Sequence, residues 1–502
     1  MKRITGPIAL LCAAAALTGS ARAGITFGVS EDRARSGDPA AFFATLGDLG
    51  LTENRASLSW DTAAPDVIPG QGQIQTWLPM AQAAGVRVVF SVAAKSPRDL
   101  STTGASAQFA AWVAHIAQSF PTVKDYVVGN EPNVNYFWQP QFDDAGHPLS
   151  GAAYEPVLAD TYDALKAVDP TINVIGIGLS PRGNDNPNAR SNISRSPVRF
   201  LHDLGVAYRA SGRTKPLMDE FAYHPYPAKN TDPPDVGYPW PNAGLPNLDR
   251  LKQAVWDAFN GTAQPTFDET PYHDSFAPPL RLQLDELGWQ VVIPPALAGL
   301  YYGTETMPTI DEATQAQYYA DSIPMAECDP SVESLNFFLL VDEPDLTRWQ
   351  SGLERIDGSH RPSYDAVKQA IAQTHGNCQG TPAVWRHSTQ VSLATVQWGN
   401  LKKVRPRRST HWSFVTGARE EATYRAGIFK AGTSRKTIAR ALSGHSPKPL
   451  LSASGLIKAK NRVVVFPARR LKQGRYIYAI RIVATMNTKR TTQVVSRPFR
   501  VR

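Results

Sequence analysis

Eight short runs rich in β-branched and aromatic residues recur between positions 25 and 373, and longer Ala-rich stretches separate them. Such alternation predicts successive βα units and a parallel sheet. The runs cover residues 25–29, 56–60, 87–92, 125–130, 173–178, 218–224, 281–286 and 334–340. Eight strands, each followed by a helix, predict an α/β fold of the (β/α)₈ (TIM) barrel type, for which ~250 residues plus insertions is an ordinary length.

The stretches between the runs have the apolar spacing of helices. The clearest helices are expected at 106–120, 154–168 and around 311–323. Thr309, with Glu312 three residues later, fits a capping box at the start of the last of these. A doubly wound sheet is the competing architecture, but no Gly-rich phosphate-binding turn follows the first run. The pattern therefore favours the barrel.

Charge divides the chain into two parts. The whole sequence has 52 Lys+Arg and 44 Asp+Glu, but residues 381–502 alone contain 26 of the former and 2 of the latter. The C-terminal part therefore has a net charge of +24, and residues 1–380 have −16. A Gly/Pro/Thr-containing linker at 376–384 separates a predicted barrel domain at 24–375 from a basic module at 385–502.

Helical periodicity is not evident beyond the linker. Alternating apolar and polar runs at 462–466, 475–484 and 492–501 predict a small antiparallel β-sandwich. The segment GRYIYAIRI at 474–482 resembles the late strand of Ig-like modules that are appended to secreted bacterial enzymes.

The N-terminal 23 residues have the organisation of a secretory signal peptide. Lys2 and Arg3 precede an apolar run at 7–17, and Ala-Arg-Ala at 21–23 fits a cleavage site before Gly24. The apolar run is shorter than the ~20 residues that a bilayer span needs. We expect export, with no transmembrane segment in the mature chain.

Export also determines how the cysteines are interpreted. Cleavage removes Cys12 and leaves Cys328 and Cys378, which predict one disulfide in an oxidising compartment. No Cys/His cluster has the spacing of a metal site, and we expect no cofactor.

Polar residues follow several of the predicted strands, and the active site of such a barrel lies at these strand ends. They are Asn130, Glu131, His224, Glu286, Asp342 and Glu343. Glu131 and Glu286 belong to strands far apart in the sequence, so they can face each other across the barrel mouth. Two facing carboxyl groups are what glycosidic bond cleavage requires.

Four segments carry a resemblance to a known group of enzymes. VVGNEPN at 127–133, YHPYP at 223–227, LDELGW at 284–289 and SGLERIDGSHRPSYDAVK at 351–368 are similar, in this order, to motifs of the retaining glycoside hydrolases of clan A. The resemblance covers residues 25–373. It implies that Glu131 is the general acid/base and that Glu286 is the nucleophile.

The same resemblance implies roles for neighbouring residues. Asn130 would hydrogen-bond the sugar 2-hydroxyl, Arg55 would support the nucleophile, and His224 and Tyr226 would orient the carboxylates or the substrate. A cation beside Glu286 favours the ionised form that a nucleophile needs.

Structural alternatives remain open for some of these residues. Arg55 could instead pair with Glu53 or Glu31, and His224 could be a core histidine. Strand alternation should point only one of Asp285 and Glu286 into the mouth, and the motif favours Glu286. Asp342 and Glu343 match no motif and are expected to be loop or capping residues.

Aromatic side chains can stack on the flat faces of sugar rings. Trp289 and Trp349 are predicted to bind substrate in this way, and further tryptophans in or beside predicted loops are candidates, although some will belong to the core. These are Trp60, Trp138 and Trp240.

The combined prediction is a secreted retaining glycoside hydrolase with a carbohydrate substrate, whose two catalytic carboxyl groups lie roughly 5 to 5.5 Å apart. One alternative is a catalytically silent carbohydrate-binding or cell-envelope protein on the same barrel, and another is an inverting hydrolase that uses Asp285 or Asp342.

The positive charge of the basic module has two interpretations. It is either an ordinary basic surface, or it retains the protein on polyanionic material such as envelope polymers or acidic polysaccharide. Nucleic acid is not an expected partner, because the chain is exported and has no nucleic-acid motif.

Overall fold

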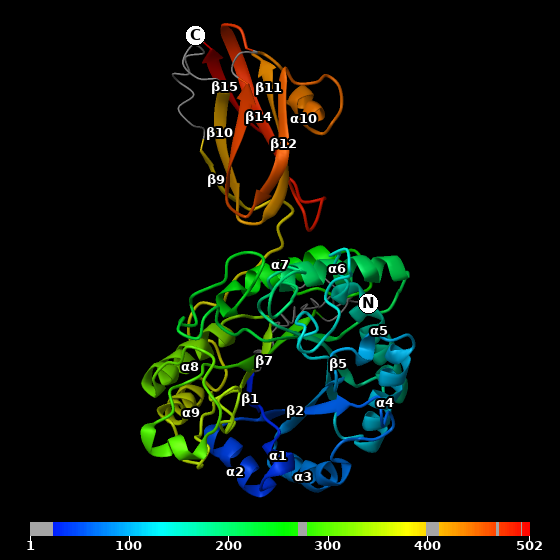
Figure 1. Cartoon of the computed structure of the whole chain (residues 1–502), viewed down its shortest axis with the longest axis vertical. Coiled ribbons are helices and arrows are strands. Elements are labelled where there is room, and N and C mark those ends of the chain that lie inside the picture. Colours follow the sequence, from blue (N-terminus) through cyan, green and yellow to red (C-terminus); the bar gives the residue numbers. More distant parts are fainter. Residues whose placement is uncertain (1–23, 270–278, 398–410, 468–470, 493, 502) are drawn as a thin grey trace, which may run out of the picture.

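The computed structural model describes residues 24–269, 279–397, 411–467, 471–492 and 494–501. The signal-peptide prediction lies outside these residues. Eight parallel strands close into a barrel in sequence order (Figure 1). The strands are β1 (Thr26–Ser30), β2 (Glu53–Trp60), β3 (Arg87–Ala94), β4 (Asp125–Val128), β5 (Asn173–Leu179), β6 (Glu220–Tyr223), β7 (Arg281–Leu287) and β8 (Val332–Phe337). The predicted (β/α)₈ barrel is confirmed.

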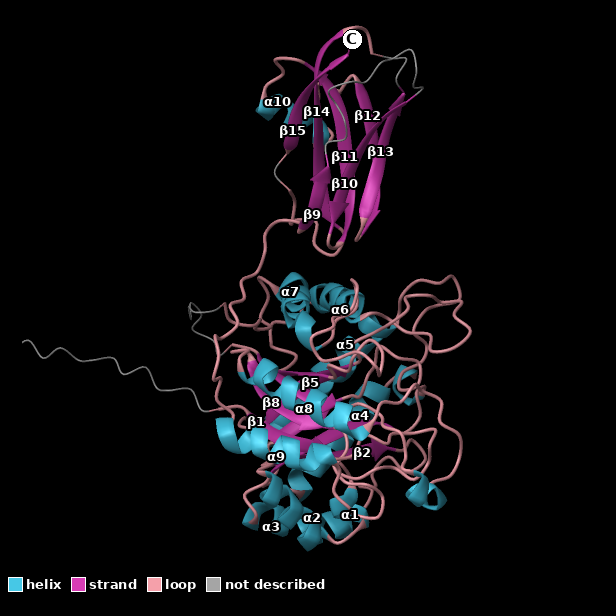
Figure 2. Ribbon diagram, turned by 90° about the vertical axis from the view of Figure 1, so that its left-hand side faces the viewer, coloured by secondary structure: helices cyan, strands magenta, loops and turns pink. Residues whose placement is uncertain are grey.

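A helix follows each barrel strand and packs on the outside of the barrel (Figures 1 and 2). These helices are α2 (Pro39–Leu49), α3 (Gln71–Ala83), α4 (Ala105–Ser119), α5 (Ser150–Val168), α6 (Pro197–Ser211), α7 (Leu248–Phe259), α8 (Glu312–Glu327) and α9 (Pro362–Thr374). Short elements in the loops are α1 (Arg33–Ser36), η1 (Asp99–Ser101), η2 (Leu245–Asn247) and η3 (Pro295–Leu300).

The start of α8 differs from the predicted capping box. Its N-cap is Asp311, whose carboxylate accepts a hydrogen bond from the Thr314 backbone N–H, and not Thr309. Asp is as good an N-cap as Thr and lies directly before Glu312, so it takes the position.

The inside of the barrel is filled in layers. Val89, Val127, Ile175 and Ala222, from four consecutive strands, form an apolar cluster. Glu53, the first residue of β2, accepts hydrogen bonds from Arg87, the first residue of β3, and from the Asn336 amide of β8. The interior is thus packed, and the place for chemistry in such a barrel is its C-terminal mouth.

Two antiparallel sheets form the C-terminal module, as predicted. One has the order β13 (Asn461–Pro467), β10 (His411–Ala418), β9 (Leu393–Gln397), and the other β12 (Leu451–Lys458), β11 (Glu421–Lys430), β14 (Gly474–Ala484), β15 (Val495–Val501). Their inner faces share a core in which the rings of Phe414 and Tyr478 stack 3.8 Å apart. A helix not expected from the sequence, α10 (Arg435–Leu442), packs with Phe429 and Ala479 on the other face of the four-stranded sheet.

Ion pairs join the module to the barrel beside α6 and α7 (Figures 1 and 2). Buried Arg490 contacts Asp257 of α7 at 2.7 Å and Glu420 of the module at 2.7 Å. Arg199 of α6 contacts Glu421 at 3.0 Å. Trp385 is buried in the barrel core. The chain beyond Thr381 therefore covers part of the barrel, and the exact domain boundaries stay a prediction.

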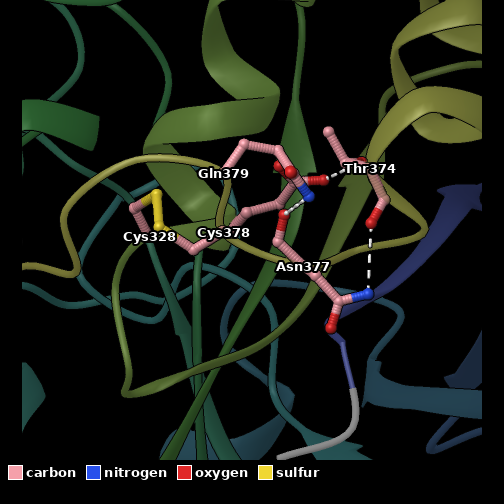
Figure 3. The surroundings of a disulfide bond; sticks show 6 residues. Cys328, Thr374, Asn377, Cys378 and Gln379 are labelled. Carbon is pink, nitrogen blue, oxygen red and sulfur yellow. Dashed lines mark hydrogen bonds between the residues drawn. A yellow bond between two sulfur atoms is a disulfide. The ribbon is translucent and has the colours of Figure 1, made fainter.

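The predicted disulfide joins Cys328, after α8, to Cys378, after α9 (Figure 3). The two Cα atoms lie 4.6 Å apart. Beside the bond, the Asn377 amide donates to the Thr374 carbonyl, and the Gln379 amide donates to the Asn377 carbonyl. The bond ties together the last two helices of the barrel.

Candidate active site

The predicted site residues meet at the C-terminal ends of the barrel strands. Arg55 lies on β2 and Glu286 on β7, while Asn130 and Glu131 follow β4 and His224 follows β6. Parallel strands bring these positions, which are distant in sequence, to one mouth of the barrel. Residues from three of the four motif segments, 127–133, 223–227 and 284–289, thus occupy one place.

Arg55 is the centre of this cluster. Its Nη1 donates to Glu286 Oε1 at 2.7 Å and its Nη2 to Asn130 Oδ1 at 2.8 Å. Its Nε lies 2.9 Å from Asp285 Oδ2, and Nη1 also reaches the Ser30 hydroxyl at 3.2 Å. Because Arg55 is only 3% exposed, these contacts hold its guanidinium in one orientation.

The alternative partners of Arg55 are engaged elsewhere. Glu53 binds Arg87 and Asn336, and Glu31 accepts hydrogen bonds from the backbone N–H groups of Asp32 and Val341. Arg55 therefore contacts the predicted nucleophile rather than either of these acids.

His224 lies between three carboxylates and has no exposed surface. Its Nδ1 is 3.0 Å from Glu131 Oε1 and 3.3 Å from Glu286 Oε2, and its Nε2 is 3.4 Å from Asp285 Oδ1. Burial favours the neutral ring, but the charges of Glu286 and Asp285 and the hydrogen bonds to Asp285 and Glu131 raise the pKa of His224 to about 10. At neutral pH the ring is a buried cation.

The shared contact with His224 limits how far apart the two predicted catalytic carboxylates lie. Since Nδ1 is 3.0 Å from one oxygen of Glu131 and 3.3 Å from one oxygen of Glu286, these two oxygens are at most 6.3 Å apart. The two side chains are 15% and 11% exposed, whereas Asp285 is 1% exposed. Glu131 and Glu286 form the solvent-facing edge of a cluster that is otherwise buried.

Asp285 and Glu286 both contact Arg55 and His224, so strand alternation does not turn Asp285 away from the cluster as expected, although only Glu286 lies at its exposed edge. The pairing of β7 with β8 shifts register between Leu284 and Leu287. Such an irregularity interrupts the strict alternation of side chains along a strand. Asp285 thereby becomes a buried anchor for both cations, and Glu286 faces outward.

The surroundings of these two adjacent acids shift their pKa values in opposite directions. Burial raises the pKa of Glu286, and the neighbouring charges of His224 and Arg55 oppose this only in part. For Asp285, burial acts in the same direction, but His224 and Arg55 outweigh it and lower the pKa. Asp285 is therefore the fixed negative charge of the cluster.

Glu131 has an unusual backbone conformation, with φ of 42°. Its N–H donates to the Gly178 carbonyl at 2.8 Å, which ties the end of β4 to β5. Residues other than glycine adopt this left-handed region at some cost in energy, and such positions concentrate at functional sites. The turn directs the Glu131 side chain toward His224.

Tyr226 and Trp349 extend the site from Glu286. The Tyr226 hydroxyl donates to Glu286 Oε2 at 3.0 Å, and its ring lies 4.8 Å from that of Trp349. Phe338 contacts Trp349 at 5.5 Å in an edge-to-face arrangement. Trp349 is partly exposed and borders the nucleophile position, as a sugar-stacking residue must.

Trp289 lies elsewhere. It is 1% exposed, packs against Tyr318 and Tyr319, and donates its indole N–H to the Asp232 carbonyl. Its predicted role as a stacking surface is therefore replaced by a role in the core. Trp60 and Trp138 are likewise buried, whereas Trp240 is partly exposed.

Asp342 and Glu343 have structural contacts. Both oxygens of buried Asp342 contact Arg361, and Tyr301 donates to one of them at 2.7 Å. Glu343 accepts a hydrogen bond from the Trp349 backbone N–H at 3.0 Å. Neither residue contacts the cluster around Arg55 among the described residues, which agrees with their interpretation as non-catalytic.

The sequence analysis missed Ser30 and Phe338. Ser30 ends β1. Its hydroxyl accepts a hydrogen bond from Arg55 and donates one to the Asp285 backbone carbonyl. Because Ser30 directly follows the predicted strand at 25–29, its position could have identified it as a site residue from the sequence. Phe338 follows β8 within a predominantly apolar run, and nothing in that run distinguishes it from a core residue.

Within the described ranges, no group of three or more His, Cys, Asp or Glu side chains could hold a metal ion. None of the helices described here has the length and hydropathy required to cross a membrane.

No protein-family profile matches the chain, and a search of curated proteins finds no similar one. Among solved structures, the chain is similar to a family 39 glycoside hydrolase from Bacteroides cellulosilyticus WH2, with 16% identity, a TM-score of 0.48, and coverage of 88% of this chain and 80% of that one. It is similar to a glucosidase from Croceicoccus marinus at 13% identity and TM-score 0.46, covering 95% and 96% of the two chains.

A third similar structure is a monomeric β-xylosidase from Caulobacter crescentus CB15, at 14% identity and TM-score 0.42, covering 89% of this chain and 95% of that one. The three solved structures are glycoside hydrolases, and their similarity to this chain is one of fold.

Proposed function

We propose that this protein is a glycoside hydrolase that cleaves a β-linked or equatorially linked glycoside with retention of configuration. The observation that supports it most is the pair Glu131 and Glu286 at the exposed edge of a buried charged cluster, with two of their oxygens at most 6.3 Å apart. This limit on one pair of oxygens is compatible with the ~5–5.5 Å that separates the two carboxyl groups of retaining enzymes.

Charge balance supports a division of roles between the two glutamates. Three carboxylates, Glu131, Asp285 and Glu286, face two cations, Arg55 and His224. One bound proton on a carboxyl group would make the cluster neutral. Arg55 bonds Glu286 directly but not Glu131, so its charge favours the ionised form of Glu286 that a nucleophile needs.

The reaction then proceeds in two displacements. The Glu286 carboxylate attacks the anomeric carbon while Glu131 gives its proton to the departing glycosidic oxygen, which leaves as an alcohol. A water molecule next attacks the glycosyl ester, Glu131 takes a proton from it, and the Glu286 carboxylate is released. Asn130, whose Oδ1 is held by Arg55, keeps its NH₂ group for the sugar 2-hydroxyl.

A panel of 4-nitrophenyl glycosides tests this proposal. We expect release of nitrophenol from at least one β-linked sugar, and NMR of the first product should show the anomeric configuration of the substrate. Inversion would refute the double displacement. Binding of oligosaccharides without turnover of any substrate would favour the catalytically silent carbohydrate-binding alternative.

Replacement of His224 by Asn should change the pH dependence of turnover. The protonated ring lowers the pKa of Glu286, so its removal should raise that pKa. Glu286 must be ionised to attack, and the acidic limb of the kcat/KM profile should therefore move to higher pH. Tyr226→Phe removes a hydrogen bond but no charge and should move the limb less. An unmoved limb in His224→Asn would contradict the arrangement.

We also propose that the protein acts outside the cell, on the basis of residues 1–23 and of the disulfide. Fractionation of cells that express the full chain, with N-terminal sequencing of the product, tests this. A product that begins at Gly24 outside the cytoplasm is expected, and an intact N-terminus in the cytoplasm would overturn it.

A further inference from the structure

The basic module has almost no acidic side chains with which to neutralise its charge. Glu420 and Glu421 are the two acidic residues between positions 381 and 502. Glu420 pairs with Arg490, and Glu421 with Arg199 of the barrel. Both carboxylates therefore serve the contact with the barrel.

Two arginines of the four-stranded sheet face each other across neighbouring strands. Arg425 of β11 and Arg481 of β14 are direct partners in the antiparallel register. Tyr424 and Ile480, the adjacent residues, point into the sandwich core, so both arginines lie on the outer face. Like charges in directly opposed positions destabilise a sheet. Neither arginine has an ion pair with a described carboxylate.

The same two arginines line a hollow between this sheet face and the end of α10 (Figure 1 shows α10 beside the sheet). Thr423, Ser443 and Ser454 add hydroxyl groups to its wall. Gly444, at φ 96°, follows α10 where a Cβ atom would lie 2.7 Å from Arg425 Nη1. The absent side chain leaves room for the guanidinium at the edge of the hollow.

We propose that this hollow is a binding site for an acidic polysaccharide, with Arg425 and Arg481 holding its carboxylate or sulfate groups and the three hydroxyls contacting its sugar hydroxyls. Two facing guanidinium groups provide the charge-assisted hydrogen bonds that such anions accept. The lining has no exposed aromatic ring on which a nucleic-acid base could stack, since Tyr424 faces the core. It also has no exposed apolar wedge for a lipid surface.

The proposed binding site does not depend on the proposed hydrolase activity, so an experiment can refute either proposal without refuting the other. Truncation at Thr381 is a poor test, because it removes Trp385 from the barrel core and Arg490 from its pairing with Asp257. Charge-removing substitutions in the full chain are the better choice.

The module supplies a matched control. Arg475 of β14 and Arg500 of β15 are also direct register partners and exposed, but neither lines the hollow. The test variant is therefore Arg425→Gln/Arg481→Gln, and the control is Arg475→Gln/Arg500→Gln. Both remove two charges, so net charge alone affects them equally.

Binding to polygalacturonate and to dextran sulfate should be measured over a salt series, with neutral dextran for comparison. We expect the test variant to bind at least one of the acidic polymers about tenfold or more weakly, and the control to lose about threefold or less. Melting temperature and turnover of an aryl glycoside should match the unmodified protein in both variants.

Equal losses in the two variants, or no loss in either, would overturn the site and leave a non-specific basic surface. Parallel measurements with duplex DNA and with phosphatidylglycerol vesicles separate the partner classes. If either binds more tightly than the acidic polymers and depends on Arg425 and Arg481, the polysaccharide assignment is wrong.

Discussion

Glu286→Gln should reduce kcat/KM on an aryl glycoside by about 10⁴-fold or more, because the variant lacks the nucleophile that forms the glycosyl ester. The amide has the same shape, its oxygen can still accept from Arg55, and its NH₂ group can donate to the Tyr226 hydroxyl oxygen, so the fold should persist. The measurement is steady-state turnover beside circular dichroism. Unchanged activity in a folded variant would remove Glu286 from the reaction.

Glu131→Ala is the complementary variant. Its kcat/KM should fall by about 10²- to 10⁴-fold on a substrate with a poor leaving group, because that group must receive a proton to depart. The fall should be much smaller on a dinitrophenyl glycoside, whose leaving group departs without a proton. Azide can enter the vacated space and attack the glycosyl ester, so added azide should restore turnover and yield a glycosyl azide of unchanged configuration. Equal losses on both substrates would contradict the acid/base role.

Asp342→Asn should lower the free energy of unfolding by up to about 3–5 kcal/mol, since it removes the charge of the carboxylate that binds both Nη atoms of the buried Arg361 guanidinium and leaves one carboxylate contact, that of Nε with Glu312 at 3.1 Å. Arg361 has no exposed side-chain surface, and Asp342 contacts it through both oxygens. Urea unfolding gives the measurement. Arg348→Gln, at an exposed pair with Glu343, should change stability by at most about 1 kcal/mol.

Turnover by Asp342→Asn distinguishes a structural role of Asp342 from a catalytic one. Below its unfolding transition, Asp342→Asn should keep most of its turnover. If Asp342 were instead the carboxylate of an inverting mechanism, activity would disappear while stability changed little. The additional change Arg361→Met should recover part of the lost stability, because it removes the buried positive charge that Asp342 had balanced.

Much of the barrel could be predicted because its strands are buried and follow a regular alternation with helices. Glu131 and Glu286 could be placed because strand ends in such a barrel converge, whereas Arg55 was expected there only from the resemblance to clan A enzymes. The inward position of Asp285 could not, since it depends on a register shift between β7 and β8. The buried state of Trp289 depends on Tyr318 and Tyr319, which come from a helix later in the chain.

Both carboxylates of the C-terminal module pair with arginines, so the charge of the module has a different origin from the charge of the catalytic cluster. With Glu420 and Glu421 the only acids after Thr381, the module's charge comes from Lys and Arg, which stay protonated well above neutrality. If the hollow binds acidic polysaccharide as proposed, added salt should therefore release the protein from the polymer, while the buried charge contacts of the barrel site, which salt screens much less, stay in place.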